Sequence, residues 1–191
     1  MKNEEIIQEN GTKKKGAAQK ERDKGWEMTG PEILLGIVFT LVLVGQIVLL
    51  FFYNNELGLA FLKYIGWGFW GLSGILGILP IIILKIKGGV KKGESYVNTS
   101  KLVTTGLYAL IRHPQYLSFM LLSTSITLIT QSWISLILNG VIIVLTYLWG
   151  WRADKSLLEK FGEEYKEYKE QVPRFNLLFG IIKYAIRKVN S

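Results

Sequence analysis

Residues 113–151 read HPQYLSFMLLSTSITLITQSWISLILNGVIIVLTYLWGW and contain no lysine, arginine, aspartate or glutamate. A second apolar region, residues 31–84, carries Glu32 at its edge and only Glu56 and Lys63 further in. A bilayer core about 30 Å thick requires roughly 20 apolar residues per helix, and a soluble domain has no need of such long uncharged runs. Both regions therefore predict membrane-spanning helices.

Short polar turns divide each of these regions in two. The turn Asn-Asn-Glu at residues 54–56 separates predicted spans at 33–53 and 59–84, which would form a hairpin. Pro114 suits the first turn of a helix, so a third span is expected to begin there. The turn Thr-Gln-Ser at residues 130–132 separates it from a fourth. The predicted fold class is an all-α membrane protein with about four transmembrane helices and C-terminal interfacial helices.

Beyond Arg152 the pattern becomes that of a soluble amphipathic helix, with aromatic and aliphatic side chains on one side and glutamate or lysine on the other. Asp154 is placed to cap the N-terminus of this helix. The sequence Val-Pro-Arg at residues 172–174 interrupts it, and residues 177–189 form a second apolar stripe with basic partners. Both helices are expected to lie at the membrane surface.

The chain thus divides into a disordered cytosolic tail (1–30), a transmembrane hairpin (31–84) and a motif-bearing catalytic region with a second hairpin and interfacial helices (85–191). The tail lacks an apolar period, so it cannot bury enough surface to offset the entropy of ordering. Lysine and arginine gather in the tail, in residues 85–112 and after residue 151, and such residues favour the cytosolic side. We expect a multi-pass integral membrane protein with both termini in the cytosol.

The composition narrows the classes of function. The 191-residue chain has no cysteine, so disulfides, thiol nucleophiles and thiolate metal sites are excluded, and we expect no metal. Its formal charge of +8 lies in clusters next to apolar runs, which is typical of membrane orientation rather than of nucleic-acid binding. Polar groups that could meet a substrate gather instead in residues 101–116 and 152–174.

These two segments carry the motifs. The first reads Lys-Leu-Val-Thr-Thr-Gly-Leu-Tyr from residue 101 and Arg-His-Pro-Gln-Tyr from residue 112. The second contains Arg-Ala-Asp from residue 152, Phe-Gly-Glu-Glu-Tyr-Lys-Glu-Tyr from residue 161 and Val-Pro-Arg from residue 172. In this order the motifs resemble those of the isoprenylcysteine carboxyl methyltransferase and phospholipid methyltransferase superfamily of integral membrane enzymes. The resemblance covers residues 101–174. The first hairpin is similar to the family only in being a hydrophobic hairpin and carries none of the motifs.

The resemblance implies methyl transfer from S-adenosylmethionine to a lipophilic or lipid-modified acceptor at the cytosolic face. This donor is a sulfonium cation with an amino-acid end, a ribose and an adenine, so its pocket requires aromatic faces, a cation and an anion. Arg112 or His113 would hold its carboxylate, and Asp154 its ammonium group or a ribose hydroxyl. The positions expected to bind the donor are Leu102, Val103, Tyr108, Arg112, His113, Pro114, Gln115, Tyr116 and Asp154.

His113 and Arg152 are the candidate catalytic residues. Methyl transfer depends mainly on alignment, but an amine acceptor must first lose a proton, and His113 is the one histidine of the chain. Arg152 would hold an anionic acceptor. Members of the family usually have an acidic pair where this chain has Ala153 and Asp154, and an arginine where it has Trp149. These departures predict that a prenylcysteine carboxylate is a poor acceptor.

Several alternatives stay open. The acceptor could be a phospholipid amine, or the chain could be a non-catalytic membrane scaffold or lipid-binding protein of the same fold. His113 could merely cap a helix, Arg112 and Arg152 could be interfacial anchors, and the tyrosines with Trp149 and Trp151 could form an aromatic belt.

Overall fold

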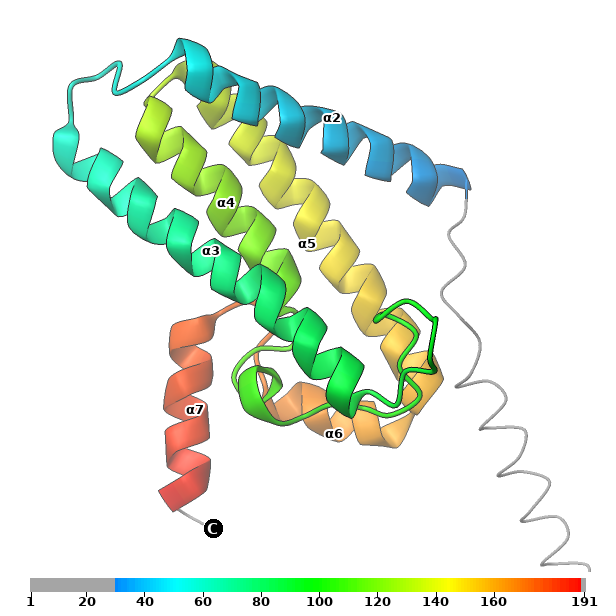
Figure 1. Ribbon diagram of the computed structural model, residues 1–191. Helices are drawn as coiled ribbons and strands as arrows, with labels where there is room; N and C mark the ends of the chain where they lie inside the picture. The colour runs from blue at the N-terminus through cyan, green and yellow to red at the C-terminus, as the bar shows by residue number, and fades with distance from the viewer. Residues whose placement is uncertain (1–29, 190–191) are drawn as a thin grey trace, which may run out of the picture.

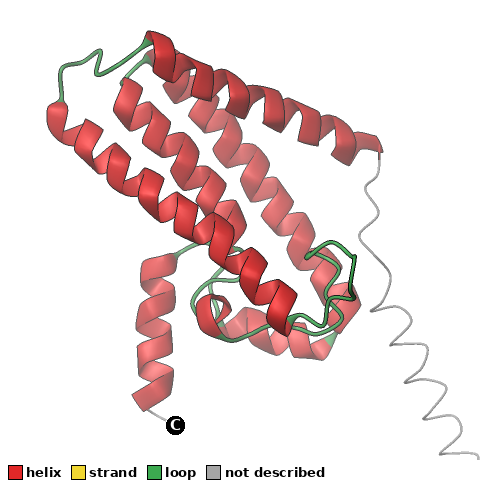
Figure 2. Ribbon diagram, viewed as in Figure 1, coloured by secondary structure: helices red, strands yellow, loops and turns green. Residues whose placement is uncertain are grey.

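The computed structural model describes residues 30–189, and the regular structure in this range is helical throughout, without strands (Figures 1 and 2). The expected all-α architecture is confirmed. The predicted tail lies outside the described residues, apart from its last residue. The helices are α2 (Gly30–Phe52), α3 (Ala60–Lys87), the 3-10 helix η1 (Gly106–Ala109), α4 (Pro114–Thr130), α5 (Trp133–Phe161), α6 (Glu163–Gln171) and α7 (Leu177–Val189).

The helices α2 to α5 run alternately in opposite directions and form a bundle (Figure 1). α3 and α4 pack along each other, α5 packs against α4, and α2 lies across α5 and α4. We call the end formed by residues 52–60 and 130–133 the distal end. The proximal end is formed by residues 87–114 together with α6 and α7. The motif segments therefore meet at one end of the bundle.

Three of these helices, α2, α3 and α5, are long and apolar enough to cross a membrane. The sequence predicted about four such spans. α4 begins at Pro114 as expected, but it has only 17 residues and buries several serines against its neighbours. Because its sides are covered by other helices, α4 does not need the uniformly apolar surface that lipid requires of α2 and α3.

Small residues let α3 approach α4 closely. A β-carbon at Gly66 would lie 2.8 Å from Cγ1 of Ile129 and 3.0 Å from the carbonyl oxygen of Ser125. At Gly77 it would lie 3.0 Å from the hydroxyl of Ser118, which donates a hydrogen bond to the carbonyl of Ser73. Close backbone approach of this kind is a main source of helix association in lipid.

A buried neutral cluster ties α2, α4 and α5 together towards the distal end. The amide nitrogen of Gln46 donates to the carbonyl oxygens of Ser123 at 3.2 Å and Ser135 at 3.0 Å. The Ser123 hydroxyl donates to the Gln46 amide oxygen at 2.8 Å, and the Thr127 hydroxyl donates to the Ser135 carbonyl at 3.1 Å. We call these four residues the Gln46 cluster.

The alternative reading of Asp154 as the N-cap of a helix is wrong. α5 continues without interruption through Asp154 to Phe161, so the residue lies inside a helix and caps nothing. The break comes at Gly162, whose φ of 58° is readily adopted by glycine. Ala153 and Asp154 are both buried, so this turn packs inward while the charged pattern around it covers the outer face. The break at residues 172–174 and the final helix α7 are as predicted.

Candidate active site

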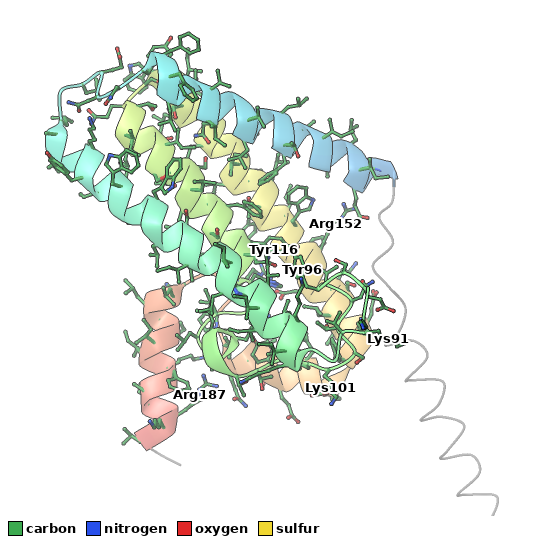
Figure 3. All side chains as sticks on the ribbon, viewed as in Figure 1. Lys91, Tyr96, Lys101, Tyr116, Arg152 and Arg187 are labelled. Atoms are coloured by element: carbon green, nitrogen blue, oxygen red, sulfur yellow. The ribbon has the colours of Figure 1, made fainter. Side chains whose placement is uncertain are left out.

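A cavity of about 410 Å³ lies at the proximal end of the bundle. Its wall is built from the start of α2, the end of α3, the connection that follows α3, η1, the start of α4, the end of α5 and α6. Figure 3 shows Tyr96, Tyr116 and Arg152, from three of these segments, gathered in the proximal half. The volume lies within the range of about 300–1,000 Å³ that is typical of small-molecule sites.

Nearly all residues singled out in the sequence line this cavity. They come from both motif segments, and the fold brings them together. The predicted site residues in the wall are Leu102, Val103, Tyr108, Arg112, His113, Pro114, Gln115, Tyr116 and Arg152. Asp154 is the exception, because it lies behind the wall with 4% of its surface exposed.

The carboxylate of Asp154 is the centre of a charged cluster. Its Oδ1 accepts hydrogen bonds from Nη1 of Arg112 at 3.0 Å, from Nε2 of His113 at 2.7 Å and from the hydroxyl of Tyr165 at 2.5 Å. Its Oδ2 accepts from Nε and Nη2 of Arg174 at 2.8 and 2.7 Å. We call these five residues the Asp154 cluster. Asp154 therefore holds together residues from four segments.

The motif at residues 172–174 fixes the backbone of the Arg-His-Pro corner. The amide of Arg112 donates to the carbonyl of Pro173 at 3.0 Å, and that of His113 donates to the carbonyl of Arg174 at 3.3 Å. A β-carbon at Gly180 would collide with the carbonyl oxygen of Leu110, so only glycine lets α7 approach this corner. These contacts explain why motifs about sixty residues apart act as one unit.

The two tyrosines of α6 form part of the cavity wall. Tyr165 and Tyr168 pack with Phe161 and Val172 in a small core, and the hydroxyl of Tyr168 donates to the carbonyl of Tyr108 at 2.7 Å. Burial raises the pKa of both α6 tyrosines well above the usual value. Each therefore stays a neutral hydroxyl donor. The sequence showed the Phe-Gly-x-x-Tyr-x-x-Tyr motif but did not place its tyrosines in the site.

His113 occupies the N-cap position of α4, yet its side chain makes no capping hydrogen bond. Its ring stacks on Tyr116 with centroids 5.4 Å apart. Because a carboxylate only accepts, Nε2 carries the proton shared with Asp154, and Nδ1 holds the lone pair of the neutral ring. Burial lowers the pKa of His113 below 6.5, against the opposing effect of Asp154. The imidazole therefore favours the neutral form.

Arg112 carries a donor that its protein surroundings leave unused. Its Nη1 is held by Asp154, but its buried Nε has no hydrogen-bond partner. A buried unpaired donor is costly unless a ligand satisfies it. Since Arg112 lines the cavity, this guanidinium suits an anionic ligand group such as a carboxylate.

The far side of the cavity includes residues that the sequence analysis did not assign to it. Glu32 of α2, Phe119 and Trp149 lie in the wall beside Arg152. Trp149 packs on Phe39 of α2 with centroids 4.8 Å apart, so it faces inward instead of joining an aromatic belt. The only sequence signal for Glu32 was its position as an acid at the edge of an apolar run.

Arg152 is half-exposed and forms an ion pair with Glu32, with Nη1 and Oε1 3.6 Å apart. Trp151, the belt candidate next to it, is 51% exposed and carries Lys155 over its ring. Within residues 30–189 no group of three or more histidine, cysteine, aspartate or glutamate side chains is arranged to hold a metal ion.

Comparison with known proteins gives a consistent result. The family model for phospholipid methyltransferase matches residues 62–164. The chain is similar to protein-S-isoprenylcysteine O-methyltransferase of Mus musculus, with 38% identity over 82 residues that cover 40% of this chain and 27% of the relative. For the Homo sapiens protein of that name the identity is 39% over 82 residues, with the same coverage.

A more distant relative of the same name, from Schizosaccharomyces pombe, is 28% identical over 78 residues, which cover 38% of this chain and 31% of the relative. The matched part thus spans less than a third of the length of these curated relatives. No solved structure matches the chain.

Proposed function

The chain belongs to the phospholipid methyltransferase family, and from this premise we propose that it transfers a methyl group from S-adenosylmethionine to a lipophilic acceptor at a membrane surface. One observation carries the proposal. A cavity of suitable size is lined by the motif residues, among them Arg112, whose buried Nε has no hydrogen-bond partner among the described residues. That combination fits a small ligand with a carboxylate and flat aromatic parts.

The donor half of the cavity is the corner around Arg112 and His113. Arg112, Tyr108 and Tyr116 line this corner; the guanidinium would hold the donor carboxylate, and the two rings would offer their faces to the sulfonium or the adenine. S-adenosylmethionine supplies, when bound, an activated methyl group that a nucleophile can displace in line. Asp154 acts here as a positioning residue, because its carboxylate fixes Arg112 and His113 from behind the wall.

The acceptor half is the side of the cavity around Phe119, Trp149 and Arg152. Its aromatic rings suit a lipophilic chain, and Arg152 suits an anionic group near the reacting atom. Neutral His113 is the candidate base if the acceptor is an amine, since the lone pair on Nδ1 can take a proton. The relatives named protein-S-isoprenylcysteine O-methyltransferase favour a lipid-modified acceptor, and a phospholipid amine is the alternative.

Donor binding tests the proposal. The affinity of the purified protein for S-adenosylmethionine is measured in detergent for wild type, His113→Ala and Tyr116→Ala. Each substitution removes a ring from the donor corner, so we expect affinity to fall about tenfold or more, as for a lost interaction worth about 1.4 kcal/mol. The matched control is Tyr64→Ala, which removes an exposed tyrosine near the distal end of α3. Unchanged affinity in both site variants would refute the proposal.

Methyl transfer then identifies the acceptor. Radiolabelled transfer is compared between an S-prenylated cysteine analogue and phosphatidylethanolamine across the pH range. An amine acceptor requires a neutral nitrogen, so its rate falls at low pH, whereas a carboxylate acceptor shows no such loss near neutrality. Ala153 and Trp149 stand where the family usually has an acidic residue and an arginine, so we expect poor turnover of the prenylcysteine analogue.

A further inference from the structure

We propose that Glu32 at the start of α2 is a specificity-determining residue, which acts through its ion pair with Arg152 and disfavours acceptors that carry only negative charge. The inference rests on the proposed function and adds a charge preference for the acceptor. Glu32 lies outside the matched family region, residues 62–164, and outside the motif segments. It enters the site only through the packing of α2 on α5.

The position of Glu32 is fixed by α2. Phe39 packs on Trp149 of α5 at 4.8 Å and on Phe119 of α4 at 5.2 Å between ring centroids. Glu32 lies seven residues before Phe39, so the two side chains share one face of the helix. The aromatic contact therefore sets the register that carries the Glu32 carboxylate to the cavity wall, where its side chain is only 16% exposed.

Glu32 is the one carboxylate among the described residues that line the cavity. The wall also contains the basic side chains Lys101, Arg112 and Arg152. Arg112 has its counter-charge in Asp154 behind the wall, which it shares with Arg174. Arg152 has its described counter-charge in Glu32. Glu32 therefore offsets the charge of Arg152, and this part of the wall would be more cationic without it.

The arginine–carboxylate contacts of the site differ in strength. Arg174 holds Asp154 with two nitrogens at 2.7 and 2.8 Å, the geometry of charge-assisted hydrogen bonds. Arg152 and Glu32 stand 3.6 Å apart, beyond hydrogen-bond distance, and the Arg152 side chain is 41% exposed. A pair of this kind is weak, so a bound anionic acceptor can displace Arg152 from Glu32.

The Arg152–Glu32 pair can select acceptors by their charge. An anionic group that binds Arg152 must separate it from Glu32 and approach a second negative charge, which opposes binding. An acceptor with a positive or a zwitterionic head group gains an attractive partner in Glu32. Glu32 therefore weakens the binding of purely anionic amphiphiles while leaving the donor corner unchanged.

The test is Glu32→Gln, which keeps the shape and removes the charge. Two quantities are measured on the full-length protein in micelles: the equilibrium binding of an S-prenylated N-acylcysteine, and the kcat/KM ratio for that anion against phosphatidylethanolamine. We expect the anion to bind roughly fivefold more tightly and the ratio to rise by roughly the same factor, as for a half-exposed pair. Affinity for S-adenosylmethionine should not change.

Three variants control for indirect effects. Glu56→Gln neutralises a carboxylate in the distal turn and should leave binding and selectivity as in wild type. Glu32→Asp keeps the charge and should retain most of the discrimination. In an Arg152→Gln background the effect of Glu32→Gln on anion binding should be much reduced, because the pair is already broken.

The outcomes separate this inference from the proposed function. Equal anion binding by Glu32→Gln and wild type overturns the role of Glu32, whether or not either protein turns over. If wild type fails to bind S-adenosylmethionine, the proposed function fails, and the binding measurement still decides whether Glu32 discriminates by charge.

Discussion

Two buried polar clusters stand at opposite ends of the same helix bundle, and they are built differently. The Gln46 cluster near the distal end is neutral, and the amide of Gln46 uses both its oxygen and its nitrogen in hydrogen bonds to α4 and α5. The Asp154 cluster at the proximal end is charged and borders the cavity.

The difference lies in what each cluster leaves unsatisfied. The Gln46 amide is buried and fully paired, and no member of its cluster lines the proximal cavity. The Asp154 cluster binds its carboxylate from several sides, yet it leaves Nε of Arg112 without a partner. A polar cluster whose groups are all hydrogen-bonded to each other stabilises packing. A cluster with an unsatisfied donor beside a cavity can bind a ligand as well.

The two ends of the bundle should lie on opposite sides of the membrane. The basic residues gather at the proximal end, and positive residues favour the cytosolic side. A topology reporter placed at Gly93 should therefore report the cytosol, and one placed at Glu56 the opposite side. The orientation would be wrong if the Gly93 reporter were found outside the cytosol.

Neutralising the proximal cluster should have the largest energetic effect. Asp154→Asn leaves the buried Arg112 and the partly buried Arg174 beside a group without charge, and breaking a buried ion pair such as Arg112–Asp154 costs about 3–5 kcal/mol. Thermal unfolding in detergent should show this loss, together with weaker binding of S-adenosylmethionine. Glu159→Gln, on the exposed face of the same helix, is the control and should change neither.

The proximal end should also respond to pH. Because burial lowers the pKa of His113 in the folded protein, the unfolded chain binds a proton more readily. Its contribution to stability is therefore present above pH 6.5 and is lost as the pH falls towards the folded-state pKa, by at most about 1.4 kcal/mol per pH unit for one proton.

Unfolding measured between about pH 8 and about pH 5 checks this expectation. His113→Gln should flatten the profile around pH 6.5, while a distal Gln46→Leu variant should keep it. An unchanged slope in His113→Gln would show that another group is responsible.

The distal cluster should give the smallest effect. Gln46→Leu removes the hydrogen bonds that join α2 to α4 and α5, and interhelical hydrogen bonds in membrane proteins contribute on average about 0.6 kcal/mol. We expect a stability loss of about 1 kcal/mol by thermal unfolding and unchanged affinity for S-adenosylmethionine. A clear loss of donor affinity would contradict the separation of the two clusters.

Much of the fold was predictable because its signals are local. Pro114 begins α4 as expected, the α4–α5 turn falls at residues 130–132, and the proline at residue 173 ends α6. The start at Asp154 was mispredicted because the charged pattern around it resembles that of a surface helix. Only the packed structure shows that this turn of α5 faces inward.

The candidate site was predictable in part for the same reason. Residues 112–116 form one local corner, so their proximity follows from the chain itself. The partners of that corner could not be inferred in this way: Asp154 reaches His113 across 41 positions, and the pairing of Glu32 with Arg152 depends on how α2 lies on α5.

The sequence by itself determined the apolar lengths, the helix limits and the motifs that mark the proximal end, since these depend on residues close together in the chain. The tertiary structure alone decided that Asp154 is a buried anchor instead of a cap, and that Glu32 joins the wall of the cavity. The physical reason is that the burial, pairing and charge balance of a side chain depend on neighbours brought together by helix packing, and spacing along the chain does not encode them.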